Sequence, residues 1–293
     1  MKKKLSLVRC LVVAPVLPTL TASSLLAGTV FSDDFTGVDP GAPSEKQSTG
    51  LNDYGYFFYN GNEGGYPWTV GTDNNSPLSG DVLRNQGAQA TNTYTYRQFG
   101  EVSLTNVGDS ISLTLDYNPN GATSGNLTIA LLNSETTITA NSFGGSSLTP
   151  DGDGYMFHQV ISGSDTSPNY YDVVNDSSYF NAANIIHTPS ETATIGGPAD
   201  GKTFSLTLTK TVLGVQIDAS IAGTTFSSFE DTTGDIYTSF NTMRIRSASG
   251  FNFDNITLSS VPEPAAGAMI LAMLAGVFCL RRRNFLRSNR VTG

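Results

Sequence analysis

The chain has 293 residues, of which 39% are hydrophobic and 10% aromatic, enough to bury one core of ordinary size. Nine of the sixteen basic residues lie in the two flanks, from Lys2 to Arg9 and from Arg281 to Arg290, whereas all 25 acidic residues lie between Asp33 and Glu263. The body between the flanks therefore has seven basic residues and a net charge of −18. A body of this charge should repel both nucleic acid and anionic lipid, so we expect neither as its partner.

The two cysteines, Cys10 and Cys279, lie in the flanks, so the body contains none. A disulfide framework, a thiol catalyst and a cysteine-based zinc site are therefore excluded from the body. We expect the body to be held together by burial alone.

The first 27 residues have the layout of a secretory signal peptide. Lys2, Lys3 and Lys4 form a basic start, Leu11 to Leu17 is an apolar run, and small residues follow up to Ala27. The alternative, a buried N-terminal helix, is disfavoured by two prolines and by the basic start. We predict a signal peptide over 1–27, which makes this an exported protein.

Residues 28–260 alternate between apolar and polar side chains at many places. The clearest case is 111–117, where every second residue is apolar, which is the period of a half-buried strand. The same alternation occurs in 204–208 and 215–221, whereas 127–132 and 155–161 are denser in apolar residues, as more central strands are. Turn signals separate these runs at Asn120-Gly121, Gly144-Gly145, Gly196-Gly197 and Ala222-Gly223.

No part of this body has a sustained helical period. Many short strands with glycine- and asparagine-rich connections predict one all-β domain over 28–260, an antiparallel β-sandwich or jelly roll. The pattern is weakest between residues 39 and 90, where we expect long loops.

That weak segment contains the densest group of aromatic residues. Two interpretations are open, because such side chains form platforms on which sugar rings stack but also fill the core of a sandwich. The candidates for carbohydrate stacking are Tyr54, Tyr56, Tyr59, Tyr66 and Trp68.

The stretch Asp151-Gly152-Asp153-Gly154 most resembles a metal site. Two carboxylates on a glycine-rich loop offer hard oxygen ligands that suit calcium, although the complete EF-hand pattern is absent. Asp151 and Asp153 are thus candidate calcium ligands, and calcium is the one cofactor that the sequence suggests. The alternative is an acidic turn.

No motif predicts catalysis. The clustered acids Glu230, Asp231 and Asp235 lack the spacing of a glycosidase pair, and we expect Glu230 and Asp231 to form a solvated turn. The only histidines are His158, expected on one face of a strand, and His187, expected in a loop. We therefore predict no catalytic residue and no enzymatic activity.

The C-terminal segment 261–293 has three parts in order. Val261 is followed by Pro262, Glu263 and Pro264, then by sixteen mostly apolar residues over 265–280, and then by Arg281, Arg282 and Arg283. As a helix the apolar run would be about 24 Å long, slightly short for a hydrocarbon layer of about 30 Å. The arginines after it would keep the C-terminus in the cytoplasm and the acidic body outside.

This segment resembles the PEP-CTERM sorting signal of Gram-negative bacteria. The resemblance implies recognition of Pro262-Glu263-Pro264 by exosortase, a membrane-embedded processing enzyme, with the transmembrane helix over 265–280 holding the precursor in the inner membrane. It further implies that the processed protein reaches the cell surface or the extracellular matrix. A plain C-terminal anchor without processing is the alternative.

The body is similar, more loosely, to the concanavalin A-like sandwiches often joined to this signal, over 102–117, 127–134 and 242–258. That likeness implies a fold more than a function. From the whole sequence we expect a non-enzymatic, structural or adhesive protein of the surface or of an exopolysaccharide matrix. The alternatives are a lectin-like carbohydrate-binding module, assisted by calcium, and a glycan-cleaving enzyme.

Overall fold

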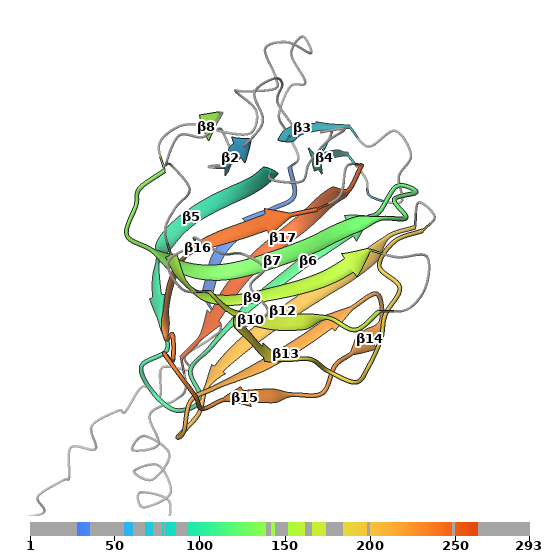
Figure 1. Cartoon of the computed structure of the whole chain (residues 1–293). Coiled ribbons are helices and arrows are strands. Elements are labelled where there is room, and N and C mark those ends of the chain that lie inside the picture. The colour runs from blue at the N-terminus through green and yellow to red at the C-terminus, as the bar shows by residue number, and fades with distance from the viewer. Residues whose placement is uncertain are drawn as a thin grey trace, which may run out of the picture. The chain divides into compact units, whose positions relative to one another are not determined.

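The alternating residues of the body form strands of two facing sheets in the computed structural model (Figure 1). The structure describes residues 28–35, 56–60, 68–72, 78, 80–85, 93–138, 142–143, 152–161, 166–173, 184–197, 200–247 and 250–262. These lie in one compact unit, Leu26–Glu263. The predicted signal peptide, Glu263, Pro264, the apolar run and the arginines after it lie outside the described residues, as do Tyr54, Tyr66 and Asp151.

Nine strands of the described chain make the first sheet. Its main path, in spatial order, is β14 (Thr224–Thr225), β13 (Val215–Ile221), β12 (Lys202–Lys210), β6 (Ser110–Asn118), β17 (Asn252–Val261), β4 (Asp81–Asn85) and β3 (Trp68–Thr72). Off this path, β1 (Gly28–Asp33) pairs with β17, and β15 (Phe229–Asp231) pairs with β13.

The second sheet has eight strands within the same ranges. In spatial order these are β11 (Ile185–His187), β10 (Asn169–Val173), β9 (Gly152–Ile161), β7 (Gly125–Ser134), β16 (Ser239–Arg246), β5 (Thr93–Ser103), β2 (Tyr56–Asn60) and β8 (Ser142–Phe143). All pairs in both sheets are antiparallel except β2 with β8. The prediction of an antiparallel all-β sandwich is thus confirmed.

The core lies between the two sheets. Phe157 of the second sheet packs edge-on against Phe204 of the first, with ring centroids 5.1 Å apart. Leu113, Leu206 and Leu258 of the first sheet are buried with Leu131 of the second in the same cluster. The side chains that alternate with them in β6, β12 and β13 are Ser, Thr, Asp and Gln, and they form the opposite, polar face. Period-2 alternation is therefore the physical origin of the sandwich.

The individual strand predictions also agree with the structure. The segment 215–221 coincides with β13, and 127–132 and 155–161 fall in β7 and β9, which lie inside the second sheet. Ala222 and Gly223, with φ of 51° and 82°, form the two-residue turn between β13 and β14. The expectation of long loops between 39 and 90 was incomplete, because β2, β3 and β4 lie there. His187, expected in a loop, ends β11.

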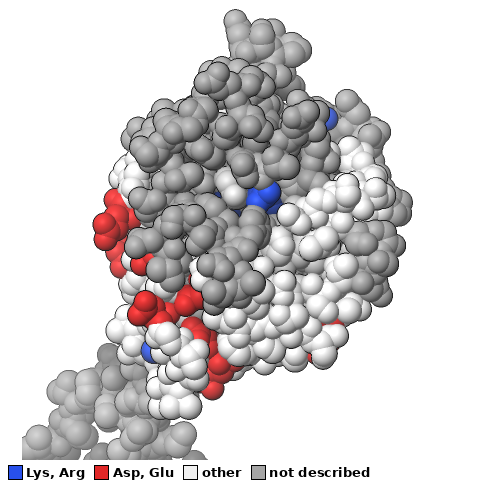
Figure 2. Space-filling view, in the orientation of Figure 1, with Lys and Arg blue, Asp and Glu red and all other residues white. Residues whose placement is uncertain are grey.

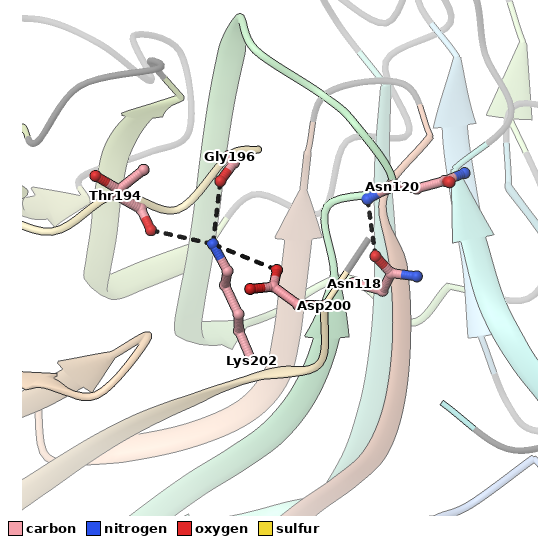
Figure 3. A network of polar contacts seen from close by, with 6 residues as sticks. All are labelled: Asn118, Asn120, Thr194, Gly196, Asp200 and Lys202. Atoms are coloured by element: carbon pink, nitrogen blue, oxygen red, sulfur yellow. Dashed lines mark hydrogen bonds and ion pairs between the residues drawn. The ribbon is translucent and has the colours of Figure 1, made fainter. Parts of the chain in front are cut away.

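A polar network fixes the loop before β12. The ammonium group of Lys202 donates to the carbonyl oxygens of Gly196 (3.0 Å) and Thr194 (3.3 Å), and it lies 3.7 Å from a carboxylate oxygen of Asp200 (Figure 3). In the facing turn the amide of Asn120 donates to the side-chain oxygen of Asn118 (2.9 Å). These contacts secure one end of the sandwich; the candidate site lies at the other.

Candidate functional site

A polar groove opens where β7 ends and β9 and β16 begin, and we call it the acidic groove. Its volume is about 430 Å³. Acidic side chains gather toward the lower left of the face in Figure 2, the side on which these strand ends lie in Figure 1. The groove is lined by Asn133, Glu135, Thr136, Gly152, Asp153, Ile236, Tyr237, Thr238 and Ser239.

Asp153 enters the groove from a strand. The sequence suggested a glycine-rich calcium loop here, but Gly152, Asp153 and Gly154 are the first three residues of β9, with Asp153 paired to Asn133 of β7. The flanking glycines permit this close pairing, since a Cβ atom at Gly154 would collide with the carbonyl oxygen of Leu131. The loop interpretation was therefore wrong for the described part of this stretch.

Two amide side chains hold the wall that contains Glu135 and Thr136. Asn241 lies at an irregularity in the pairing of β16 with β5, and its amide bonds both the N–H (2.8 Å) and the carbonyl (2.8 Å) of Ser134. Gln98 donates to the carbonyl oxygen of Thr136 (2.6 Å) and accepts from the amide of Ile138 (2.8 Å). These two side chains therefore hold the end of β7 and the residues after it where the backbone pairing of β7 with β16 stops.

The opposite wall contains Tyr237, which is half-buried and rests on the fully buried Tyr155. The ring of Tyr237 packs edge-on against that of Tyr155, with centroids 5.6 Å apart. The hydroxyl of Tyr155 donates to Asp231 (2.9 Å), which also accepts the amide of Thr233 (3.1 Å). Glu230 and Asp231 both lie in strand β15, so the expectation of a turn was wrong; Glu230 is exposed as expected, whereas Asp231 is fully buried.

Among the carboxylates near the groove, that of Asp172 in β10 has the pKa that differs most from its ordinary value. Burial, followed by the negative charges of Asp231 and Asp235, raises its pKa to about 6 from the ordinary 3.8. The hydroxyl of Tyr237 offsets part of that rise, although it makes no regular hydrogen bond with any described residue. This end of the sandwich therefore concentrates carboxylates, and burial beside the others raises the pKa of one of them.

The aromatic candidates are divided by burial. Trp68 is fully buried and packs against Phe253, with centroids 6.0 Å apart. Tyr56 is also fully buried, and its hydroxyl donates to Asp33 (2.9 Å). Both side chains belong to the core, the second of the two interpretations that the sequence left open. Tyr59 lies in β2, where the structure does not describe its side chain.

His158 lies on the outward face of the second sheet, on a strand as expected. It is buried, and its Nδ1 is 3.1 Å from the hydroxyl oxygen of Thr128. Burial and the charge of Arg246 lower the pKa of His158 to about 4, so its ring is neutral at physiological pH. The guanidinium groups of Arg244 and Arg246 lie 5.4 and 5.5 Å from the ring centroid of Tyr94 on this face.

The chemistry of the groove suits hydroxyl-rich ligands. Carboxylates accept hydrogen bonds, the Asn133 amide both donates and accepts, and hydroxyls do either. Within the described ranges, no group of three His, Cys, Asp or Glu side chains is arranged to hold a metal ion. No helix of the described chain is long and apolar enough to cross a membrane.

Comparisons with known proteins gave structural likenesses only. No protein-family model matches the chain, and no curated protein matches it. A mutant of the Emp46p carbohydrate recognition domain aligns with a TM-score of 0.45 at 13% identity, over 80% of this chain and 97% of that one. An endo-1,3-beta-glucanase from Streptomyces sioyaensis aligns with a TM-score of 0.46 at 14% identity, over 85% and 100%.

A third similar structure is a protein of unknown function with a galectin-like fold from Bacillus subtilis. It has a TM-score of 0.44 and 12% identity, over 80% of this chain and 98% of the other. None of the three TM-scores reaches 0.5, so these likenesses assign neither ligand nor activity to this chain.

Of the groove residues, the sequence singled out Asp153, but as a calcium ligand in a loop. Asn133, Glu135 and Tyr237 were missed, because they come from segments that no local motif connects. The one available signal was the irregular polar stretch Asn133-Ser134-Glu135-Thr136 directly after a dense apolar strand.

Proposed function

We propose that this protein is an exported, non-enzymatic adhesive module that binds a neutral polysaccharide in the acidic groove. The observation that carries the proposal is the groove lining, in which carboxylate, amide and hydroxyl groups converge beside the Tyr237 ring. Saccharide sites combine such directional polar groups with an apolar surface. We place the partner in the surrounding exopolysaccharide matrix.

The charge of the groove narrows the ligand class. Glu135 and Asp153 line it, and Asp172 and Asp235 lie nearby. Ionised carboxylates attract hydroxyl donors but repel uronates and sulfated sugars. A neutral glycan is therefore the preferred ligand, and an anionic one would need a bridging cation such as calcium. Chelation with EDTA distinguishes the two, since only cation-bridged binding would be lost.

Binding to a glycan array, followed by titration of the best neutral glycan, tests the proposal. Glu135→Gln should weaken binding about tenfold or more, because hydrogen bonds to a charged group contribute about 1.5–3 kcal/mol. Glu101→Gln is the matched control, since Glu101 is exposed on β5 and does not line the groove. If no glycan binds, or if both variants bind like the wild type, the groove is not a saccharide site.

A glycan-cleaving enzyme is the second candidate, favoured by the raised pKa of Asp172 beside other carboxylates. Glycosidases pair a protonated acid with an ionised carboxylate, and a pKa of about 6 suits the acid. The discriminating measurement is release of reducing ends from the bound glycan. Cleavage lost in Asp172→Asn would establish the enzyme, whereas binding without cleavage establishes the adhesive module.

We further propose that residues 261–293 sort the protein to the cell surface through a PEP-CTERM signal. The support is that the three parts of the signal occur in the expected order and directly follow β17, which ends at Val261. Changing Pro262, Glu263 and Pro264 to alanine should trap an uncleaved precursor in the inner membrane, as seen by fractionation and mass. A processed triple-alanine variant at the surface would contradict this proposal.

A further inference from the structure

Exposed aliphatic side chains gather at one end of the first sheet. Val212 is 81% exposed, Leu213 67%, Val107 48% and Val261 36%. Among the large hydrophobic side chains that the structure describes, these are four of the five most exposed. We call these four residues the apolar rim.

The backbone brings the members of the rim together. Val261 pairs with Ser110 at the start of β6, and Thr209 near the end of β12 pairs with the same residue from the other side. The turn that contains Val107 is bonded to Lys210 through Gly108 N–H (2.7 Å) and through the carbonyl of Asp109 (2.9 Å). Val212 and Leu213 follow directly in the tip between β12 and β13.

Asp109, Glu230 and Lys210 are charged residues that lie close to the apolar rim. Asp109 is buried, and its carboxylate accepts the backbone amides of Thr105 (2.9 Å) and Asn106 (2.7 Å). The hydroxyl of Thr211 donates to exposed Glu230, and half-buried Lys210 has an aliphatic stem long enough to reach polar surroundings. Burial of the valine and leucine side chains therefore leaves Asp109 as it is and lets the ammonium group of Lys210 stay in water, whereas exposed Glu230 has to remain at the water-facing edge of the rim.

The course of the chain indicates what covers the rim. Strand β17 ends at Val261, itself a rim residue, and the apolar run begins at Ala265. Covalent geometry keeps the Cα atoms of these two residues at most about 14 Å apart. Strand β1 starts at the same end, with Gly28 paired to Ser260. Whatever holds the apolar run is therefore within reach of the rim.

We propose that the apolar rim docks on the surface of the lipid bilayer while the C-terminal segment is attached. The inference rests on anchoring of residues 265–280, but it does not depend on glycan binding. Docking inserts Val212 and Leu213 at the boundary between the lipid headgroups and the acyl chains, as aliphatic side chains at an interface do. It also keeps Pro262-Glu263-Pro264 at the membrane surface, where a membrane-embedded enzyme acts.

Fluorescence quenching in the full chain tests the docking. The protein, with Cys10→Ser and Cys279→Ser, is reconstituted into phosphatidylcholine vesicles that carry a nitroxide high on the acyl chain. A dye is attached through Leu213→Cys or, as control, through Ser124→Cys in the exposed turn after β6 at the opposite end. We expect quenching at position 213 to be several-fold stronger than at position 124. Equal quenching would overturn the proposal.

A second variant separates docking from anchoring. Val212→Ser with Leu213→Ser should lower quenching of a dye attached through Val107→Cys toward the control level, while flotation with the vesicles is unchanged. Both changes are on exposed side chains, so folding is retained. A wild-type chain that fails to float would overturn anchoring and docking together. If the dye is shielded more at higher protein concentration and lipid has no effect, a second copy of the chain covers the rim. That result would overturn docking but not anchoring.

Discussion

Two carboxylates have unusual protonation because of where the fold places them. Burial raises the pKa of Asp254 to about 6, as it does that of Asp172. Nearby negative charges add to the rise in both cases, from Asp116 and Asp34 for Asp254. Neither carboxyl is part of a motif, so these properties arise from packing alone.

Stability should therefore depend on pH in a defined direction. Between about pH 4 and 6 the folded state holds protons on Asp172 and Asp254 that the unfolded chain has released, so stability falls as pH rises through 6. Thermal unfolding followed by circular dichroism should give a lower midpoint at pH 7.5 than at pH 5. Asp172→Asn should reduce that difference. If the thermal midpoint of Asp172→Asn falls between pH 5 and 7.5 by as much as that of the wild type, the raised pKa of Asp172 is contradicted.

Arg97 forms an ion pair that links strands far apart in sequence. Its Nε is 3.1 Å from the carboxylate of Asp33, which is 6% exposed, and its guanidinium lies 4.5 Å from the ring centroid of Phe31. Arg97→Met should destabilise the domain by about 3 kcal/mol or more, because a buried carboxylate loses its counter-ion. Chemical denaturation measures the loss. The double variant with Asp33→Asn should recover part of it, and no recovery would mean that the ring contacts matter more than the charge.

At the scale of elements, side-chain hydrogen bonds hold backbone segments at places where strand pairing stops. On the side of β7 that faces β16, the side chain of Asn241 bonds the backbone of Ser134 beyond the last paired residue, and Lys202 binds the carbonyls of Thr194 and Gly196 (Figure 3). Backbone carbonyls left without a donor would make these segments open more readily.

Lys202→Met should loosen the loop over 193–197 without unfolding the sandwich. Methionine keeps most of the apolar stem but cannot donate to the two carbonyls. Hydrogen exchange should become faster at Ala193 and Gly197, whose amides bond the carbonyls of Thr166 and Ala122, while exchange in β6 stays slow. If exchange became faster by the same factor in the loop and in β6, Lys202 would stabilise the whole domain and not the loop alone.

At the scale of the whole molecule, the acidic charge of the body opposes folding through mutual repulsion. The seven basic residues of the body cannot balance its 25 acidic ones. Repulsion between exposed carboxylates is screened over about 10 Å at 0.1 M salt, so salt should relieve it. We expect the thermal midpoint at pH 7.5 to rise between about 20 and 300 mM sodium chloride. Sucrose at equal osmolality is the control, and a midpoint that falls with salt would mean that attractive ion pairs dominate.

The sequence by itself determined the strands and their class. Alternation in 111–117, 204–208 and 215–221 depends only on which residues are apolar, and each run became a strand whose apolar residues face the core. The turn at Ala222-Gly223 was likewise visible, since glycine at its second position permits the left-handed backbone found there.

Only the tertiary structure decided which segments meet. The acidic groove combines Asn133 with residues 135–136, 152–153 and 236–239, and the ion pair of Arg97 reaches back to Asp33. The sequence left open whether Tyr56 and Trp68 form a platform or the core, and it suggested a solvated turn for Asp231; all three are buried. The physical reason is that alternation is a local property of a strand, whereas sheet pairing and burial depend on strands distant in the chain.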